Sequence, residues 1–170
     1  IVAGVQLPCA VGWAVLAHAT RSARERDWLE RRLALVQAGA PLNLEMAATD
    51  EMVAIARRIR PEMAMLVPEG RHEITTEGGL DVCSLEKKLA KAVARLAAAG
   101  IVVSVFIDPE IKQVEAARRI GASVCEVHTG PYAHAFHAKG RDAEARAVVR
   151  ELTKVRKAGE RIRALGMRFN

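Results

Sequence analysis

From residue 41 onward, short apolar runs rich in strand-forming residues alternate with longer stretches of helical periodicity. The expected strands are residues 42–46, 64–67, 101–108, 123–128 and 167–170. Strands separated by helices in this way are typical of βα units and a parallel sheet. The alternation therefore predicts the α/β class, as either an open doubly wound sheet or a (β/α) barrel.

The segments between the expected strands carry the start and stop signals of helices. Thr49 is a candidate N-cap for a helix that Pro61 ends. Gly100 and Gly121 close the next two helices, and Asp108, followed by a proline, opens the second of these. In the segment 131–137 the sequence is loop-like.

Acidic side chains stand where three of the expected strands end, namely Glu45, Asp108 and Glu126. No glycine-rich nucleotide-binding motif follows any strand, which removes the main support for a nucleotide-binding open sheet. The carboxyl-terminal rim of a barrel is where such enzymes hold catalytic side chains, so the barrel is favoured.

Side chains alternate along a strand, so Asn43 and Glu45 point to the same side of their strand. Glu126 and His128 likewise share a side of theirs. A carboxylate directed into a barrel mouth is costly unless it is paired or functional. Glu45 is therefore a candidate catalytic residue. For Asp108 the favoured interpretation is a helix cap, because Asp before Pro commonly has that role.

The loop of residues 71–82 contains Thr75, Gly78 and Gly79, with positive charge at its start. Hydroxyls and closely approaching backbone can bind a phosphate. An ordinary glycine-containing turn before a helix explains the same residues equally well, and both interpretations stay open.

Histidines and cysteines give no pattern of a metal site. His128, His134 and His137 lack carboxylates at ligand spacing, so no metal is expected. The 3 cysteines are scattered, which predicts buried thiols in a reducing compartment rather than disulfides or zinc. The apolar run at residues 1–19 contains Gln6 and Pro8, and is expected to be neither a signal peptide nor a membrane span.

A net charge of +6 suits an anionic partner without identifying it. The final helix presents an apolar stripe of Val148, Leu152, Val155 and Ile162 opposite a basic side. A solvated outer face explains these basic residues, and nucleic-acid binding is a third interpretation that rests on charge alone. Aromatic residues, on which bases of single strands stack, make up only 4% of the chain, which weakens the nucleic-acid interpretation further.

Four segments closely resemble pyridoxine 5'-phosphate synthases: NLEMAATDEMVAIA at 43–56, LVPEGRHEITTEGGLDV at 66–82, VSVFIDPE at 103–110 and CEVHTGPYA at 125–133. The resemblance runs from residue 41 to about residue 133 and resumes through the final helix to LGMRFN. It implies a (β/α)8 TIM barrel that condenses 1-deoxy-D-xylulose 5-phosphate with 3-amino-2-oxopropyl phosphate. The products are pyridoxine 5'-phosphate, phosphate and water.

The resemblance also implies roles for individual residues. Glu45 matches the family's catalytic glutamate, Glu126 a glutamate thought to stabilise a transition state, and Thr75 the threonine that binds deoxyxylulose phosphate. It further implies a cytoplasmic homo-octamer that needs no metal or organic cofactor, with phosphorylated small molecules as partners and neither nucleic acid nor membrane.

Residues 1–40 diverge from the family pattern. The expected first strand is absent, and around the second strand His18 keeps the spacing of a catalytic histidine while Arg21 lies one place beyond a phosphate-binding arginine. His18 is thus a candidate base and Arg21 a candidate phosphate ligand. A compensated reading-frame shift within 1–40 is one explanation of the divergence.

The last family elements, with a general-acid histidine and phosphate-binding glycines, do not follow Asn170. The chain is therefore expected to form one partial barrel domain over residues 1–170, with residues 41–170 as its clear family match. The alternative to an active synthase is an inactive fragment that binds sugar phosphates or serves as an assembly module.

Overall fold

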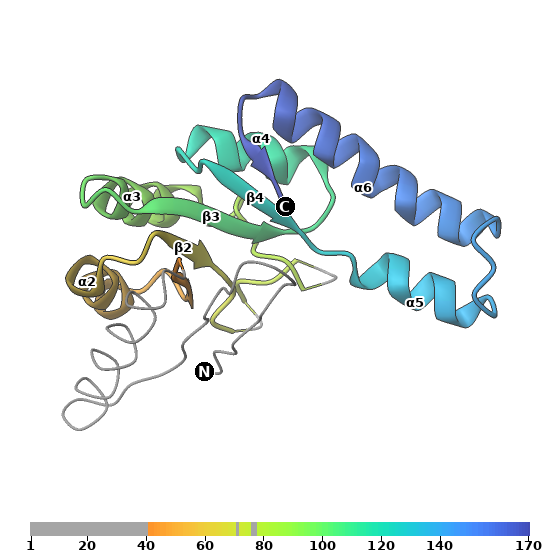
Figure 1. The fold of residues 1–170 in the computed structure, drawn as a ribbon, viewed down its shortest axis with the longest axis horizontal. Helices are drawn as coiled ribbons and strands as arrows, with labels where there is room; N and C mark the ends of the chain where they lie inside the picture. Colours follow the sequence, from red (N-terminus) through yellow and green to blue (C-terminus); the bar gives the residue numbers. More distant parts are fainter. Residues whose placement is uncertain (1–40, 71, 76–77) are drawn as a thin grey trace.

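The computed structural model describes residues 41–70, 72–75 and 78–170 (Figure 1). Within them, five parallel strands form one sheet in the order β1-β2-β3-β4-β5. The strands are β1 (Asn43–Met46), β2 (Met63–Leu66), β3 (Val102–Ile107), β4 (Val124–Val127) and β5 (Arg168–Phe169). Strand order that follows chain order is that of a β/α barrel, whereas doubly wound sheets reverse direction. The predicted α/β class is confirmed, and the five strands form a consecutive part of such a barrel.

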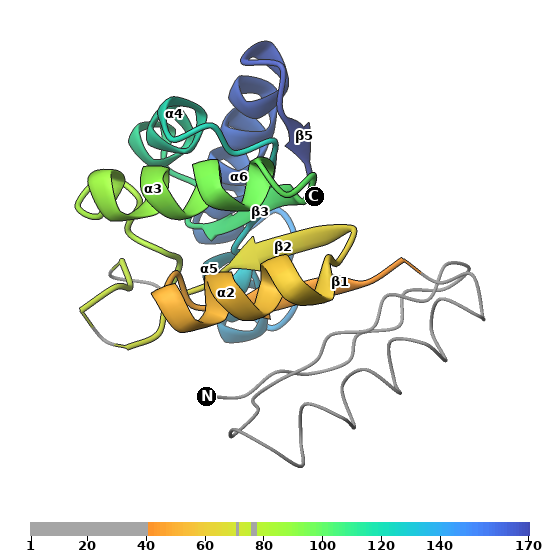
Figure 2. The same ribbon diagram turned by 90° about the vertical axis from the view of Figure 1, so that its left-hand side faces the viewer.

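Helices connect these strands, and all but α5 were expected from the sequence. They are α2 (Asp50–Ile59), α3 (Glu86–Ala97), α4 (Ile111–Arg119), α5 (Gly130–Ala138) and α6 (Arg146–Ala164). Figure 2 shows α2 and α3 side by side in front of the sheet, with α4 beyond α3. In Figure 1, α5 and α6 run alongside each other away from the sheet, and the other end of α6 returns to β5.

The core lies between the sheet and these helices. One side of each of the first four strands is fully buried there, including Leu44, Leu66, Val105 and Cys125, each with 0% exposure. Because strand side chains alternate, the intervening residues of the same strands lie on the opposite side of the sheet.

Local signals set the helix ends. The Thr49 hydroxyl accepts a hydrogen bond from the Met52 N–H at 3.2 Å, which confirms the predicted cap. Gly100 and Gly121 adopt φ angles of 77° and 86°, a left-handed conformation that favours glycine after a helix.

The interpretation of Asp108 as a helix cap is wrong. The residue at the N-cap of α4 is Glu110, and it makes no side-chain capping bond. Asp108 lies two residues earlier and its side chain turns toward other parts of the chain, as described below.

The loop expected at residues 131–137 is instead helix α5. None of its residues is buried, and its apolar side chains follow no helical stripe that a sequence pattern could reveal. It packs against α6, and Tyr132 stacks on Phe136 with ring centres 6.2 Å apart. A proline in its first turn is compatible with a helix start.

The buried side of α6 also differs from the expected stripe. Val148 and Ile162 are fully buried, but Leu152 is 50% exposed. Glu151 is buried in its place, and its carboxylate pairs with Arg150 and Lys154, each at 2.8 Å. The buried side of α6 thus includes Glu151 in place of Leu152.

Ion pairs partly neutralise the basic side of α6. Besides the two pairs on Glu151, Arg161 pairs with Glu115 of α4 at 2.7 Å. This supports the interpretation of the basic residues as a solvated outer face. No helix in the described part of the chain has the length and hydrophobicity needed to cross a membrane.

Candidate active site

Polar residues collect on the side of the sheet opposite the helices. We call this side the site face, and its members, taken from the strand registers and the alternation along each strand, are Asn43, Glu45, Met63, Met65, Val102, Ser104, Phe106, Val124, Glu126 and Arg168. Asn43 and Ser104 are buried, and the Asn43 Oδ1 and Ser104 Oγ atoms find no hydrogen-bond partner in the described residues. Buried polar atoms without partners are uncommon and mark this face as unusual.

Two carboxylates dominate the site face. Glu45 of β1 and Glu126 of β4 are both half-buried, near the carboxyl ends of their strands. Burial raises the pKa of both groups, and the negative charge of Glu126 raises the pKa of Glu45 further. The two groups are therefore electrostatically coupled across the sheet, although their strands are separated by β2 and β3.

The neighbours of these carboxylates explain the desolvation. Glu45 is in register with Met65, and Glu126 with Phe106, so each carboxylate lies beside a large apolar side chain on the same face. A carboxylate with a raised pKa is a better proton acceptor than an ordinary one, and also a usable proton donor. The pair suits chemistry that moves protons on a bound substrate.

Thr75 lies on a tight hairpin between β2 and α3. We call residues 72–75 and 78–82 the Thr75 loop. The Thr75 N–H donates to the Gly79 carbonyl at 2.7 Å, and Ile74 and Leu80 form an antiparallel bridge. The Thr75 hydroxyl is buried without a hydrogen-bond partner among the described residues. The glycine-containing turn expected from the sequence is therefore present at this loop.

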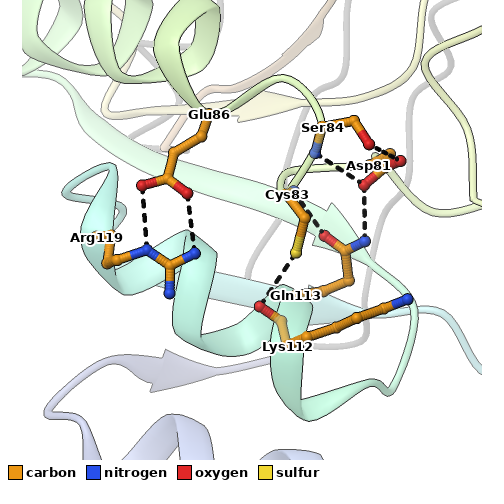
Figure 3. Close-up of polar contacts among 7 residues, drawn as sticks. All are labelled: Asp81, Cys83, Ser84, Glu86, Lys112, Gln113 and Arg119. Carbon is orange, nitrogen blue, oxygen red and sulfur yellow. Dashed lines mark hydrogen bonds and ion pairs between the residues drawn. The ribbon is translucent and has the colours of Figure 1, made fainter.

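A buried polar network fastens the base of this loop to α4 (Figure 3). The Gln113 amide, 1% exposed, donates to the Asp81 carboxylate at 2.9 Å and accepts from the Cys83 N–H at 3.2 Å. Asp81 also accepts the Ser84 N–H and hydroxyl, which forms the turn that leads into α3. Burial by itself would raise the pKa of Asp81, but the hydrogen bonds from Ser84 and Gln113 outweigh it and lower this pKa.

The sequence analysis missed an interaction between Asp108 and His128. The His128 Nδ1 atom lies 2.9 Å from the Asp108 Oδ1 atom, and the side chain of Asp108 is only 3% exposed. The same oxygen accepts the Gly79 N–H at 3.3 Å. The signal in the sequence was the period of two, which puts Asp108 in line with Phe106 on the site face.

The remaining candidates divide into two groups. His18 and Arg21 lie outside the described residues. His134 and His137 are exposed on α5. No group of three or more His, Cys, Asp or Glu side chains in the described ranges is arranged to hold a metal ion.

Comparison with known proteins places these residues in a family context. The family described as pyridoxal phosphate biosynthesis protein PdxJ matches residues 16–170, a range that includes both His18 and Arg21.

Curated relatives bear the name pyridoxine 5'-phosphate synthase. Those from Aromatoleum aromaticum, Azoarcus sp. and Dechloromonas aromatica are 76%, 73% and 71% identical over 129 residues. The aligned part covers 76% of this chain and 51%, 52% and 51% of the respective relatives. The chain thus spans about half the length of the curated relatives it matches.

Among solved structures, a thiamine phosphate pyrophosphorylase from Pyrococcus furiosus is similar with a TM-score of 0.45 and 13% identity, covering 94% of this chain and 84% of that one.

Proposed function

The chain belongs to the PdxJ family, and from this premise we propose that it carries part of the active site of a pyridoxine 5'-phosphate synthase. The observation that carries the proposal is the pair Glu45 and Glu126, two half-buried carboxylates with raised pKa values at the carboxyl ends of parallel strands. Two coupled carboxylates of this kind are suited to proton transfer.

The proposed reaction joins 1-deoxy-D-xylulose 5-phosphate to 3-amino-2-oxopropyl phosphate and closes a pyridine ring, with loss of phosphate and water. Glu45 takes protons from the condensing carbon skeleton during imine, enamine and dehydration steps. Glu126 stabilises the transition state, and Thr75 binds the sugar phosphate through its unpartnered hydroxyl.

Further parts of the proposal come from the resemblance of the sequence to the family. His18 is proposed as a second base and Arg21 as a phosphate ligand. The assembly is proposed to be a homo-octamer in the cytoplasm. The apolar, unburied helix α5 supports an assembly contact, because Tyr132 and Phe136 lie on it without a buried environment of their own.

The test is the formation of pyridoxine 5'-phosphate and inorganic phosphate by the purified chain given both substrates. Glu45→Gln removes the base with little change in shape, and we expect the rate to fall by about 10²–10⁴-fold. Glu160→Gln, the same change at an exposed position on α6, is the matched control and should keep full activity.

Two results would contradict the proposal. Full activity in Glu45→Gln would remove Glu45 from the chemistry. No product from a folded wild-type chain that still binds the sugar phosphate would favour the alternative, an inactive sugar-phosphate-binding or assembly module of the same family.

A further inference from the structure

The Asp108 carboxylate lies at a junction of three parts of the chain. Its Oδ1 atom accepts from His128, which follows β4, and from Gly79 in the Thr75 loop, while Asp108 itself follows β3. Such a side chain, 3% exposed, is expensive to bury unless it has a role that compensates. Its second oxygen, Oδ2, has no hydrogen-bond partner within the described residues, so stability alone does not explain the residue.

The contact with Gly79 leads directly to Thr75. Gly79 donates its N–H to Asp108 and accepts the Thr75 N–H with its carbonyl, so a single residue links the carboxylate to the threonine backbone. Gly79 also lies so close to the end of β3 that a Cβ atom there would be 2.7 Å from the Ile107 carbonyl carbon. Only glycine permits this approach.

The contact with His128 fixes the imidazole. A carboxylate only accepts hydrogen bonds, so the Nδ1 atom of His128 carries the proton that it donates to Asp108. The ring is confined by Phe106, with ring centres 5.3 Å apart, and by Gly130, where a Cβ atom would be 3.0 Å from Cε1. Gly78 lies on the loop side, where a Cβ atom would be 3.7 Å from the same carbon.

We propose that Asp108 is a positioning residue: through Gly79 and His128 it holds the Thr75 loop at a fixed place over the ends of β3 and β4, and so sets the Thr75 hydroxyl for a sugar phosphate. The role in ligand binding rests on the proposed function, whereas the anchoring of the loop does not. Asp108 touches neither substrate in this proposal and acts through its two partners.

Four variants of the full chain separate the two partners of Asp108. Asp108→Ala removes both contacts, and Asp108→Asn keeps an acceptor oxygen of the same size. Gly79→Ala acts on the loop contact, because a Cβ atom there would clash with the Asp108 backbone nitrogen and lie 3.0 Å from Oδ1, and so displaces the loop from Asp108. Val114→Ala, a fully buried position in α4, lowers stability without touching the junction and is the control for a general loss of packing.

Three measurements are made on each variant. Amide hydrogen exchange follows the loop N–H groups of Thr75, Gly79 and Leu80, and ¹⁵N NMR at pH 8 reports which nitrogen of His128 carries the proton. Titration calorimetry with 1-deoxy-D-xylulose 5-phosphate gives its Kd without requiring turnover.

For Asp108→Ala we expect about tenfold faster loop exchange, loss of the Nδ1–H form of His128 and about tenfold weaker sugar-phosphate binding. Gly79→Ala should likewise speed loop exchange and raise the Kd. Asp108→Asn should restore most of the loop protection and binding, and Val114→Ala should change none of the three readouts by more than about threefold.

The proposal is overturned if Asp108→Ala leaves loop exchange and the His128 spectrum as in wild type. It is equally overturned if the loop is released but the Kd does not change. A wild-type chain that binds no sugar phosphate contradicts the proposed function, and in that case the exchange and NMR results still decide whether Asp108 anchors the loop.

Discussion

Glu45 and Glu126 are ordinary carboxylates that the fold places in a poorly solvated setting. Met65 and Phe106 lie beside them in register, and the charge of Glu126 acts on Glu45. The consequence is that the proton affinity of each group depends on the other. The coupling leads to a prediction about pH dependence, and the burial leads to one about stability.

The first concerns the pH dependence of the proposed activity. Since Glu45 must be ionised to accept a proton, the acid limb of kcat/KM is expected above the ordinary value of 4.5. Glu126→Gln removes the repulsion, so the acid limb should move to lower pH, along with a lower kcat. It should stay above the ordinary value because burial still raises the pKa of Glu45.

Glu126→Asp keeps a negative charge and is the control, with an acid limb close to that of wild type. Steady-state kinetics between pH 4 and 8 check the prediction. An acid limb that does not move in Glu126→Gln would show that the two carboxylates are not coupled in solution.

The second prediction concerns stability. A carboxyl group with a raised pKa binds its proton more tightly in the folded than in the unfolded state, so stability falls as the pH rises from 4.5 through the folded-state pKa. The cost is fully present above the folded-state pKa. Glu45→Gln, which cannot ionise, should therefore be more stable than wild type at pH 7, and the difference should vanish as the pH falls below 4.5.

Urea unfolding at several pH values measures this difference. Glu160→Gln, at an exposed site, should show no such trend. If Glu45→Gln is less stable than wild type at pH 7, the carboxylate is stabilised by contacts and the burial argument fails. The expected gain of stability together with loss of activity is the usual trade-off at a functional site.

Among the elements, the connection from β2 to α3 depends most on buried polar contacts. Gln113 of α4 holds Asp81 and Cys83 at the base of the Thr75 loop, as Figure 3 shows. The ion pair between Glu86 of α3 and Arg119 of α4 also joins this region to α4, but it is well exposed. The two contacts should differ greatly in their contribution to stability.

Gln113→Leu leaves the half-buried partners of Gln113 without their hydrogen bonds, and we expect a loss of about 1–3 kcal/mol in the free energy of unfolding. Arg119→Gln, which removes the exposed pair, should cost much less, because solvent screens exposed charges. Urea denaturation of both variants provides the comparison. Equal losses would mean that the buried amide adds nothing beyond an ordinary surface contact.

Helix α5 shows the limit of sequence reasoning at this scale. Its residues have no amphipathic period, none is buried, and the helix packs along the neighbouring α6. On α6, Glu151 is buried and Leu152 is exposed. Neither outcome could be read from periodicity, because α6 packs against α4 and α5 as well as against strands of the sheet.

For the molecule as a whole, Cys125 is a reporter of global unfolding. It lies in the centre of the core with 0% exposure, and burial raises the pKa of its thiol to about 12. Since the thiolate is the reactive form, Cys125 should react with alkylating agents only when the whole sheet unfolds.

Cys83 is the internal comparison. It is half-buried near the start of α3, and burial together with the charge of Asp81 raises its pKa. Mass spectrometry after labelling in increasing urea should find Cys83 modified first and Cys125 modified only through the main transition. Labelling of Cys125 at the same rate as Cys83 in native buffer would contradict the structure of the core.

The sequence by itself determined the α/β class, the approximate positions of the strands, the helix ends at Thr49, Gly100 and Gly121, and the two carboxylates as candidates. These follow from local signals, namely alternation, caps, glycines and acidic residues at strand ends, which act over a few residues. Only the tertiary structure decided which strands adjoin, that Glu45 and Glu126 influence each other, and that Asp108 joins Gly79 to His128. Those contacts link residues that are distant along the chain, so their geometry depends on the packing of the whole sheet.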